Sequence, residues 1–198
     1  MQEMTSVERV HNAIDRKPVD RLPVSESFWG ETITRWQASG ELQEGEDPIC
    51  HFDLDMRRGG GISNVADLDF EPVIIEETQE TVLALDGNGA TLRRHKLHAS
   101  TPEHVDFTVK ERRGWEEHVK PHLLDVDRRR IPFEGYREQR RLAATEERHF
   151  CWSGTAPFEQ MHPMCGHEYM LMGMAEDPDW VRDMVMTYAE FTIMHMEV

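Results

Sequence analysis

The 198-residue sequence has few basic residues and no long apolar run. Its 22 Lys and Arg residues stand against 38 Asp and Glu residues, a formal net charge of −16, whereas nucleic-acid binding depends on clustered cations that displace counterions. No apolar run approaches the roughly 20 residues of a membrane-spanning helix, and residues 1–4 lack the pattern of a signal peptide. We therefore expect a cytoplasmic protein with no nucleic-acid and no membrane partner.

Cysteine is also scarce. Cys50, Cys151 and Cys165 are odd in number and lack zinc-finger spacing, which fits a reducing compartment better than a disulfide framework. The one basic cluster, from Arg128 to Arg141, is interleaved with glutamates, so a solvated helix face is favoured over a landing site for an anionic partner. No Gly-x-Ser-x-Gly elbow and no dinucleotide fingerprint supports a hydrolase or an NAD enzyme.

The first 60 residues contain clear local signals. Thr5 and Glu8 form a capping box at the start of a helix, and Pro18 ends that helix. Arg21–Val24 predicts a short buried strand, and a second helix begins near Trp29. Asp47 followed by proline starts a short third helix, and the glycine run 59–61 predicts a flexible loop.

Strand periodicity dominates residues 70–110. Three apolar runs lie in this region, and the last two are separated by the turn Asp86–Gly89, whose Asp-Gly and Asn-Gly pairs suit a β-hairpin. Apolar and polar residues alternate over Val105–Val109, which predicts one more strand. Helices over 115–120 and 134–147, a buried strand at His149–Ser153, and helices over 166–175 and after Asp177 complete the pattern. This succession of helices and strands indicates an α/β fold with an antiparallel β-hairpin insertion at 70–110.

The order of these parts resembles the uroporphyrinogen decarboxylase superfamily, which includes cobalamin-dependent (corrinoid) zinc methyltransferases. The resemblance rests on these segments: Glu8-Arg9-Val10, Pro18–Val24, Trp29 with Glu31-Thr32, Phe52–Met56, Cys151–Gly154 and Asp177-Pro178. It implies a (β/α)8 TIM barrel. Because such a barrel needs roughly 250 residues, we expect residues 1–198 to be the N-terminal part of a single barrel domain, inactive by itself.

The resemblance also implies a catalytic residue. In the family's decarboxylase an aspartate at an early strand end accepts hydrogen bonds from pyrrole N–H groups and stabilises developing positive charge, and Asp55 is the closer match to it than Asp53. A structural role, as a loop acid or helix cap, is the alternative. Arg57 and Arg58 beside Asp55 are candidates for binding an anionic substrate.

Further substrate-binding candidates are Trp29, Ser153 and Thr155. Ser153 and Thr155 stand where the loop after a barrel strand belongs, and Trp29 is either a substrate contact or a core or subunit contact. The namesake enzyme carries an arginine-rich clamp after its first strand, where this chain has Ser25–Glu31 with two acids and no arginine. Eight substrate carboxylates would be repelled there, so a smaller anionic substrate is expected.

The segment 162–168 holds the densest group of ligand-type side chains. His162, Cys165 and His167 are of the types that bind zinc, although this spacing differs from the His-x-Cys pair of the family's methyltransferases. We expect decarboxylation of an anionic, tetrapyrrole-like or smaller substrate without a cofactor. The alternatives are zinc-dependent methyl transfer with a corrinoid protein, and a non-catalytic ligand-binding barrel. A homodimer is one candidate assembly state.

Overall fold

A computed structural model describes residues 3–154 and 156–198. The chain divides into two compact units, one within Met1–Gly61 and Pro132–Ser153 and the other within Ile62–Ile131 and Gly154–Val198. The elements of the first unit are α1 (Ser6–Ile14), α2 (Gly30–Ser39), α3 (Pro48–His51), β1 (Met56–Gly61), α5 (Phe133–Thr145) and β6 (His149–Ser153).

The second unit combines an antiparallel sheet with helices. Its elements are β2 (Val73–Glu77), β3 (Thr81–Leu85), β4 (Ala90–His95), β5 (Glu103–Phe107), α4 (Arg112–His118), the short 3-10 helices Lys120–Leu123 and Arg128–Arg130, α6 (Pro157–Glu176) and α7 (Pro178–Met196). The four strands follow one another in the order β2-β3-β4-β5, and the predicted hairpin joins β3 to β4. This antiparallel region was predicted from its turn residues.

Helix α1 begins at the predicted capping box. The hydroxyl of Thr5 accepts a hydrogen bond from the backbone N–H of Glu8, and the Glu8 carboxylate accepts one from the N–H of Thr5. Each side chain thereby satisfies a donor that the first helical turn leaves unpaired. Val10 is buried, so one side of α1 packs into the unit.

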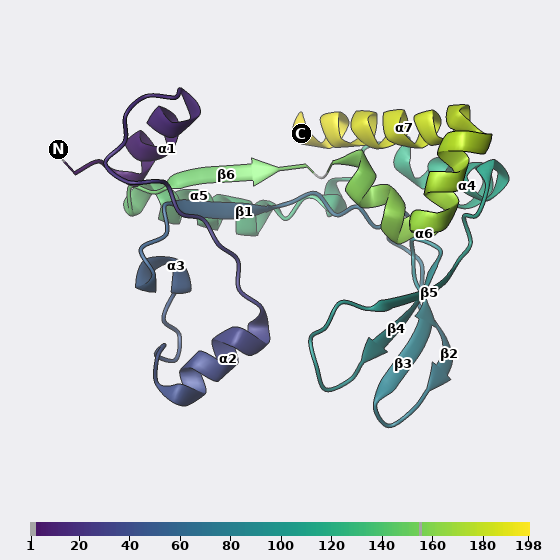
Figure 1. The fold of residues 1–198 in the computed structure, drawn as a ribbon, viewed down its shortest axis with the longest axis horizontal. Coiled ribbons are helices and arrows are strands. Elements are labelled where there is room, and N and C mark those ends of the chain that lie inside the picture. The colour runs from purple at the N-terminus through teal and green to yellow at the C-terminus, as the bar shows by residue number, and fades with distance from the viewer. Residues whose placement is uncertain (1–2, 155) are drawn as a thin grey trace. The chain divides into compact units, whose positions relative to one another are not determined.

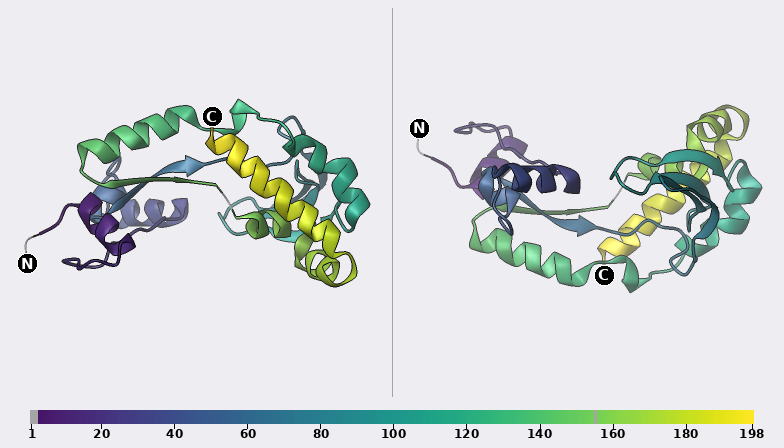
Figure 2. Two further views of the ribbon diagram at one scale, coloured as in Figure 1. Left: turned by 90° about the horizontal axis from the view of Figure 1, so that it is seen from above. Right: turned by 90° about the horizontal axis from the view of Figure 1, so that it is seen from below.

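The first unit is built around two parallel strands. β1 pairs with β6, and α5 packs against both strands, as Figures 1 and 2 show. On β6, the rings of Phe150 and Trp152 lie edge-on to Tyr136 of α5, with ring centroids 5.1 and 5.8 Å away. Successive side chains of a strand point to opposite faces, so one face of this sheet is closed by α5.

Two local predictions were wrong. Residues 59–61 form the end of β1 instead of a flexible loop, because the pairing with β6 resumes at Gly61, opposite Ser153, after an irregularity that follows Arg58. Arg21–Val24 is not a strand, and Leu22 is 79% exposed. Val24 instead exchanges hydrogen bonds with Asp55: its N–H donates to the Asp55 carboxylate, and its carbonyl accepts from the Asp55 N–H.

Gly59 is required by the close approach of Phe150. A Cβ atom at this position would lie 2.6 Å from the end of the Phe150 ring, closer than carbon atoms pack. We expect Gly59→Ala to lower the free energy of unfolding by about 1–3 kcal/mol, the cost of overpacking a core. Urea denaturation measures this change.

Gly30→Ala is the matched control, because nothing lies within 4 Å of a Cβ atom there and the residue begins α2. Alanine favours a helix, so Gly30→Ala should leave stability unchanged or slightly higher. Equal stability of the Gly59→Ala and wild-type proteins would contradict the packing of Phe150 on Gly59.

Helix α6 is interrupted at Gly166. Its backbone there has φ 72° and ψ 159°, outside the helical region, and a Cβ atom would lie 2.5 Å from the ring of Phe107 on β5. The second helical stretch, after Gly166, agrees with the predicted helix over 166–175. The last helix begins as predicted, with the Asp177 carboxylate accepting from the N–H of Trp180.

The architecture is therefore mixed α/β, with one parallel and one antiparallel sheet, as the sequence predicted in outline. The described residues form no closed barrel, so the TIM-barrel assignment and the single-domain boundary stay predictions. Across residues 3–154 and 156–198, no helix combines the length and apolar character needed to span a membrane.

Candidate functional site

Asp55 lies immediately before β1 and is fully buried. Arg9 Nη1 donates to its Oδ1 at 2.6 Å, and Arg21 Nη1 donates to its Oδ2 at 2.5 Å. The hydroxyl of Ser6 and the backbone N–H of Val24 add donors at 2.8 and 2.7 Å. Both carboxylate oxygens are therefore occupied by donors from the chain itself.

Asp20 extends this arrangement. Arg9 donates through Nε and Nη2 to the two oxygens of Asp20 at 2.7 and 2.8 Å, so that its guanidinium bridges two carboxylates. We call Arg9, Asp20, Arg21 and Asp55 the N-terminal ion-pair network. The network joins three of the segments on which the family resemblance rests, and it fixes the residues that lead into β1.

The electrostatics of Asp55 follow from these contacts. Burial acts to raise the pKa of its carboxyl, but hydrogen bonds from Arg21, Val24, Ser6 and Arg9 outweigh it and hold the pKa below the ordinary value. The Asp55 carboxylate is buried, and both of its oxygens already accept hydrogen bonds from the chain. It is therefore poorly placed to accept hydrogen bonds from the pyrrole N–H groups of a substrate. The catalytic role of Asp55 stays a prediction, and the geometry favours the structural alternative.

The network makes stability depend on pH. Hydrogen bonds from Arg9, then from the Met4 N–H, also hold the pKa of Asp20 below its ordinary value. Carboxylates with a depressed folded-state pKa stabilise the protein fully above the unfolded pKa, about 3.9, and lose that contribution as the pH falls toward the folded pKa. We expect the free energy of unfolding to decrease below about pH 4.

Urea titrations between pH 6 and pH 2.5 test this expectation. Asp20→Asn removes one titrating group, so its stability should fall less steeply with decreasing pH than that of the wild type. A wild-type stability that stays constant or rises over this acid range would be incompatible with the depressed pKa values.

Arg57 on β1 is also buried. Its Nε lies 2.5 Å from Glu146 Oε2, its Nη2 lies 2.6 Å from Asp47 Oδ2, and its Nη1 lies 3.2 Å from Gln139 Oε1. The side chain is 2% exposed and ties β1 to α5 and to the cap of α3. Its donors are occupied, so the geometry does not support the substrate-binding role predicted for Arg57.

Arg58 points to the other face of the parallel sheet. It pairs in register with Cys151 on β6, and Ser153 is paired with Gly61 at the carboxyl ends of the two strands. Because Phe150 and Trp152 pack on α5, the side chains of Cys151 and Ser153 belong to the face opposite α5. We call Arg58, Cys151 and Ser153 the Arg58 face.

The guanidinium of Arg58 is a cation that a ligand on the Arg58 face can reach. Arg58 is exposed, and its Nη2 lies 3.5 Å from the hydroxyl of Ser25. Among the described residues, no carboxylate lies within 4.0 Å of its guanidinium, in contrast to Arg57. Ser153 is exposed at the strand end, and its role as a ligand contact stays a prediction, whereas Thr155 lies outside the described residues.

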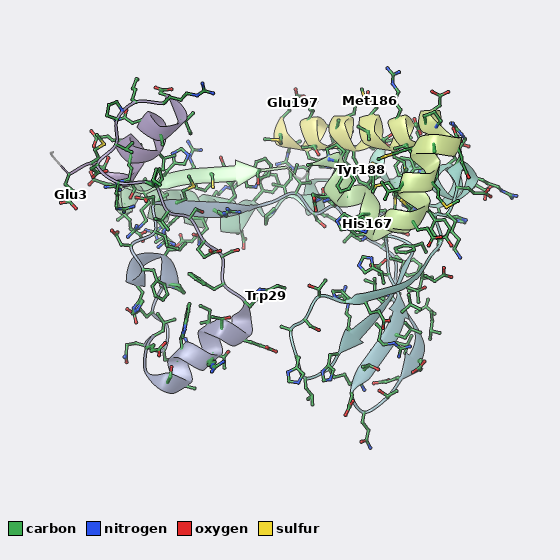
Figure 3. The ribbon with its side chains drawn as sticks, in the orientation of Figure 1. Glu3, Trp29, His167, Met186, Tyr188 and Glu197 are labelled. Carbon is green, nitrogen blue, oxygen red and sulfur yellow. The ribbon has the colours of Figure 1, made fainter. Side chains whose placement is uncertain are left out.

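Trp29 is 61% exposed at the N-terminal end of α2 (Figure 3). Trp36, about two helical turns further along the chain, instead packs against Phe28 and Phe52, with ring centroids 5.2 and 5.0 Å away. Of the two tryptophans, Trp29 is thus the one with an accessible ring.

The predicted zinc ligands are only partly brought together. The rings of His162 and His167 stack with centroids 4.6 Å apart, but Cys165 is buried and its thiol donates to the carbonyl of Met161. Burial raises the pKa of the Cys165 thiol to about 12, which disfavours the thiolate that metals bind. The described part of the chain contains no group of three or more His, Cys, Asp or Glu side chains arranged for a metal ion.

No known protein family, curated protein or solved structure matches the chain significantly.

Proposed function

We propose that this chain belongs to an enzyme of the uroporphyrinogen decarboxylase type, in which Arg58 binds a carboxylate of a small anionic substrate. The observation that carries the proposal is the contrast along β1. Arg57 is buried between two carboxylates, whereas its neighbour Arg58 is exposed without such a partner among the described residues. A guanidinium in this state can form a bidentate pair with a carboxylate.

The strand arrangement supports a barrel-type site. β1, α5 and β6 form two parallel neighbours with a helix against one face, the repeating unit of a (β/α)8 barrel. In such a barrel the face opposite the helices points inward, and ligands bind at the carboxyl ends of the strands. Arg58 and Ser153 lie on the corresponding face in this proposal, and Ser153 is at the carboxyl end of its strand.

The proposed reaction breaks the bond between a carbon atom and its carboxylate. CO2 leaves, the bonding electron pair stays on the carbon, and a proton from solvent or an acid replaces CO2. Tight pairing of Arg58 with the departing carboxylate would stabilise the ground state and slow the reaction. Arg58 therefore holds a second carboxylate that is retained in the product, and it contributes binding and orientation.

Measurement of CO2 release from carboxylated pyrroles, including porphobilinogen, by the enzyme to which this chain belongs tests the proposal. Arg58→Met should raise KM about tenfold or more, because a charge-assisted hydrogen bond contributes about 1.5–3 kcal/mol, while kcat changes little. CO2 release with the same KM in the variant would refute the role of Arg58. Binding without CO2 release across the series would favour the non-catalytic ligand-binding alternative.

A further inference from the structure

The second unit contains a cavity of about 520 Å³ between β5 and α6. Its walls include the rings of Phe107 and Tyr169, and three histidines line it: His104 from β5, and His162 and His167 from the two sides of the Gly166 kink. Figure 3 shows His167 on the side of α6 toward the four-stranded sheet. The volume is in the range of small-molecule sites, which combine apolar walls with a few polar groups.

The three imidazoles lie close enough to affect one another. The stacked rings of His162 and His167 are inclined by only 18°. Burial lowers the pKa of His104, and the positive fields of His162 and His167 lower it further. Imidazole N–H groups are hydrogen-bond donors, so an anion in the cavity can accept hydrogen bonds from this group.

The remaining charges around the cavity leave room for such an anion. Asp106 lines the cavity, but its carboxylate lies 2.7 Å from the Lys110 ammonium. Glu159 lies 3.2 Å from Nε2 of His162, and Glu168 lines the rim as an exposed side chain. Asp106 is thus neutralised by a lysine, Glu159 contacts a histidine, and Glu168 lies at the exposed rim.

Gly166 shapes the floor of the cavity. Its left-handed backbone, with φ 72°, lets the ring of Phe107 approach to a distance that a Cβ atom would prevent. The kink also places His162 before it and His167 after it on neighbouring turns, which brings their rings into contact. The cavity therefore depends on a particular backbone conformation and on the packing of α6 against β5.

We propose that this cavity binds a small aromatic carboxylate, with its ring against Phe107 and Tyr169 and its carboxylate against the histidines. Apolar contact with the two aromatic walls favours a planar ring. The imidazole N–H groups favour an anionic acceptor. This site is formed by the second unit and is independent of the function proposed for the Arg58 face.

Titration with phthalate, followed by calorimetry and by NMR of the histidine ring protons, tests the proposal. We expect saturable binding that shifts the resonances of all three histidines, with affinity reduced about tenfold in His104→Gln and in His162→Gln, as expected for loss of one charge-assisted hydrogen bond. His118→Gln is the control, because His118 is an exposed histidine of α4 outside the cavity. It should bind phthalate like the wild type.

Two further probes separate the contributions of ring and charge. Benzamide keeps an aromatic ring without the charge, and inorganic phosphate carries charge without a ring; both should bind at least about tenfold more weakly than phthalate. Equal affinity for benzamide would overturn the role of the histidines, and equal affinity for phosphate would overturn the aromatic part. Unchanged phthalate affinity in both histidine variants, or no detectable binding to the wild type, would overturn the site itself.

Discussion

Replacing Asp55 by asparagine is expected to lower the free energy of unfolding by about 3–5 kcal/mol, the usual cost of breaking a buried ion pair. The substitution keeps the shape of the side chain but removes the negative charge that faces Arg9 and Arg21. It also turns an amide N–H group toward donors that need an acceptor. Urea denaturation monitored by circular dichroism measures the change.

Asp53→Asn is the matched control. Asp53 is two residues away and also contacts arginines, at 3.4 Å from Arg21 and 3.2 Å from Arg148, but its side chain is 77% exposed. Exposed pairs contribute little, so we expect a change within about 1 kcal/mol. If Asp55→Asn were as stable as Asp53→Asn, the N-terminal ion-pair network would not hold this unit together.

Replacing Arg57 by methionine is expected to lower the free energy of unfolding by about 2–4 kcal/mol, slightly less than for a fully buried pair because Glu146 and Asp47 are partly exposed. The substitution leaves two carboxylates near β1 without their shared cation. It should also loosen the contact between β1 and α5, which thermal unfolding would show as a lower Tm.

Arg58→Met provides the comparison at the adjacent position. Arg58 is exposed, so its loss should change the free energy of unfolding by about 0.5 kcal/mol or less. Two neighbouring arginines should thus differ by several-fold in their effect on stability. An equal loss in both variants would show that Arg58 is also a structural residue.

Local features of the fold could be predicted from the sequence. The capping box of Thr5 and Glu8, the Asp47 cap and the hairpin turn at Asp86–Gly89 each depend on residues within a few positions of one another. Strand β1 could not be predicted in this way. Its glycines have weak strand preference, and the partner that makes them a strand, β6, lies about ninety positions further along the chain.

The candidate site likewise combines residues that the sequence points to locally with contacts that depend on distant parts of the chain. The sequence drew attention to Asp55, Arg57 and Arg58, but nothing local distinguishes a buried arginine from its exposed neighbour. That distinction follows from strand alternation once β1 is known, because Arg57 then faces α5 and Arg58 the opposite side. The pairing of Arg9 with Asp55 spans 46 positions and leaves no periodic signal.

His104 was missed for a related reason. It lies just before the predicted strand Val105–Val109, and only the packing of α6 against β5 brings it to His162 and His167. Cys165 was included because it lies between these histidines in the sequence. The Gly166 kink directs its thiol into the core instead, where it donates to the carbonyl of Met161.

Equilibrium titration of porphobilinogen into the wild-type, Arg58→Met and Arg57→Met proteins tests the central claim most directly. We predict that Arg58→Met binds about tenfold or more weakly with wild-type stability, whereas folded Arg57→Met keeps its affinity with reduced stability. The opposite pattern, with affinity lost on replacing Arg57 and retained on replacing Arg58, would contradict the assignment of one arginine to the fold and the other to the ligand.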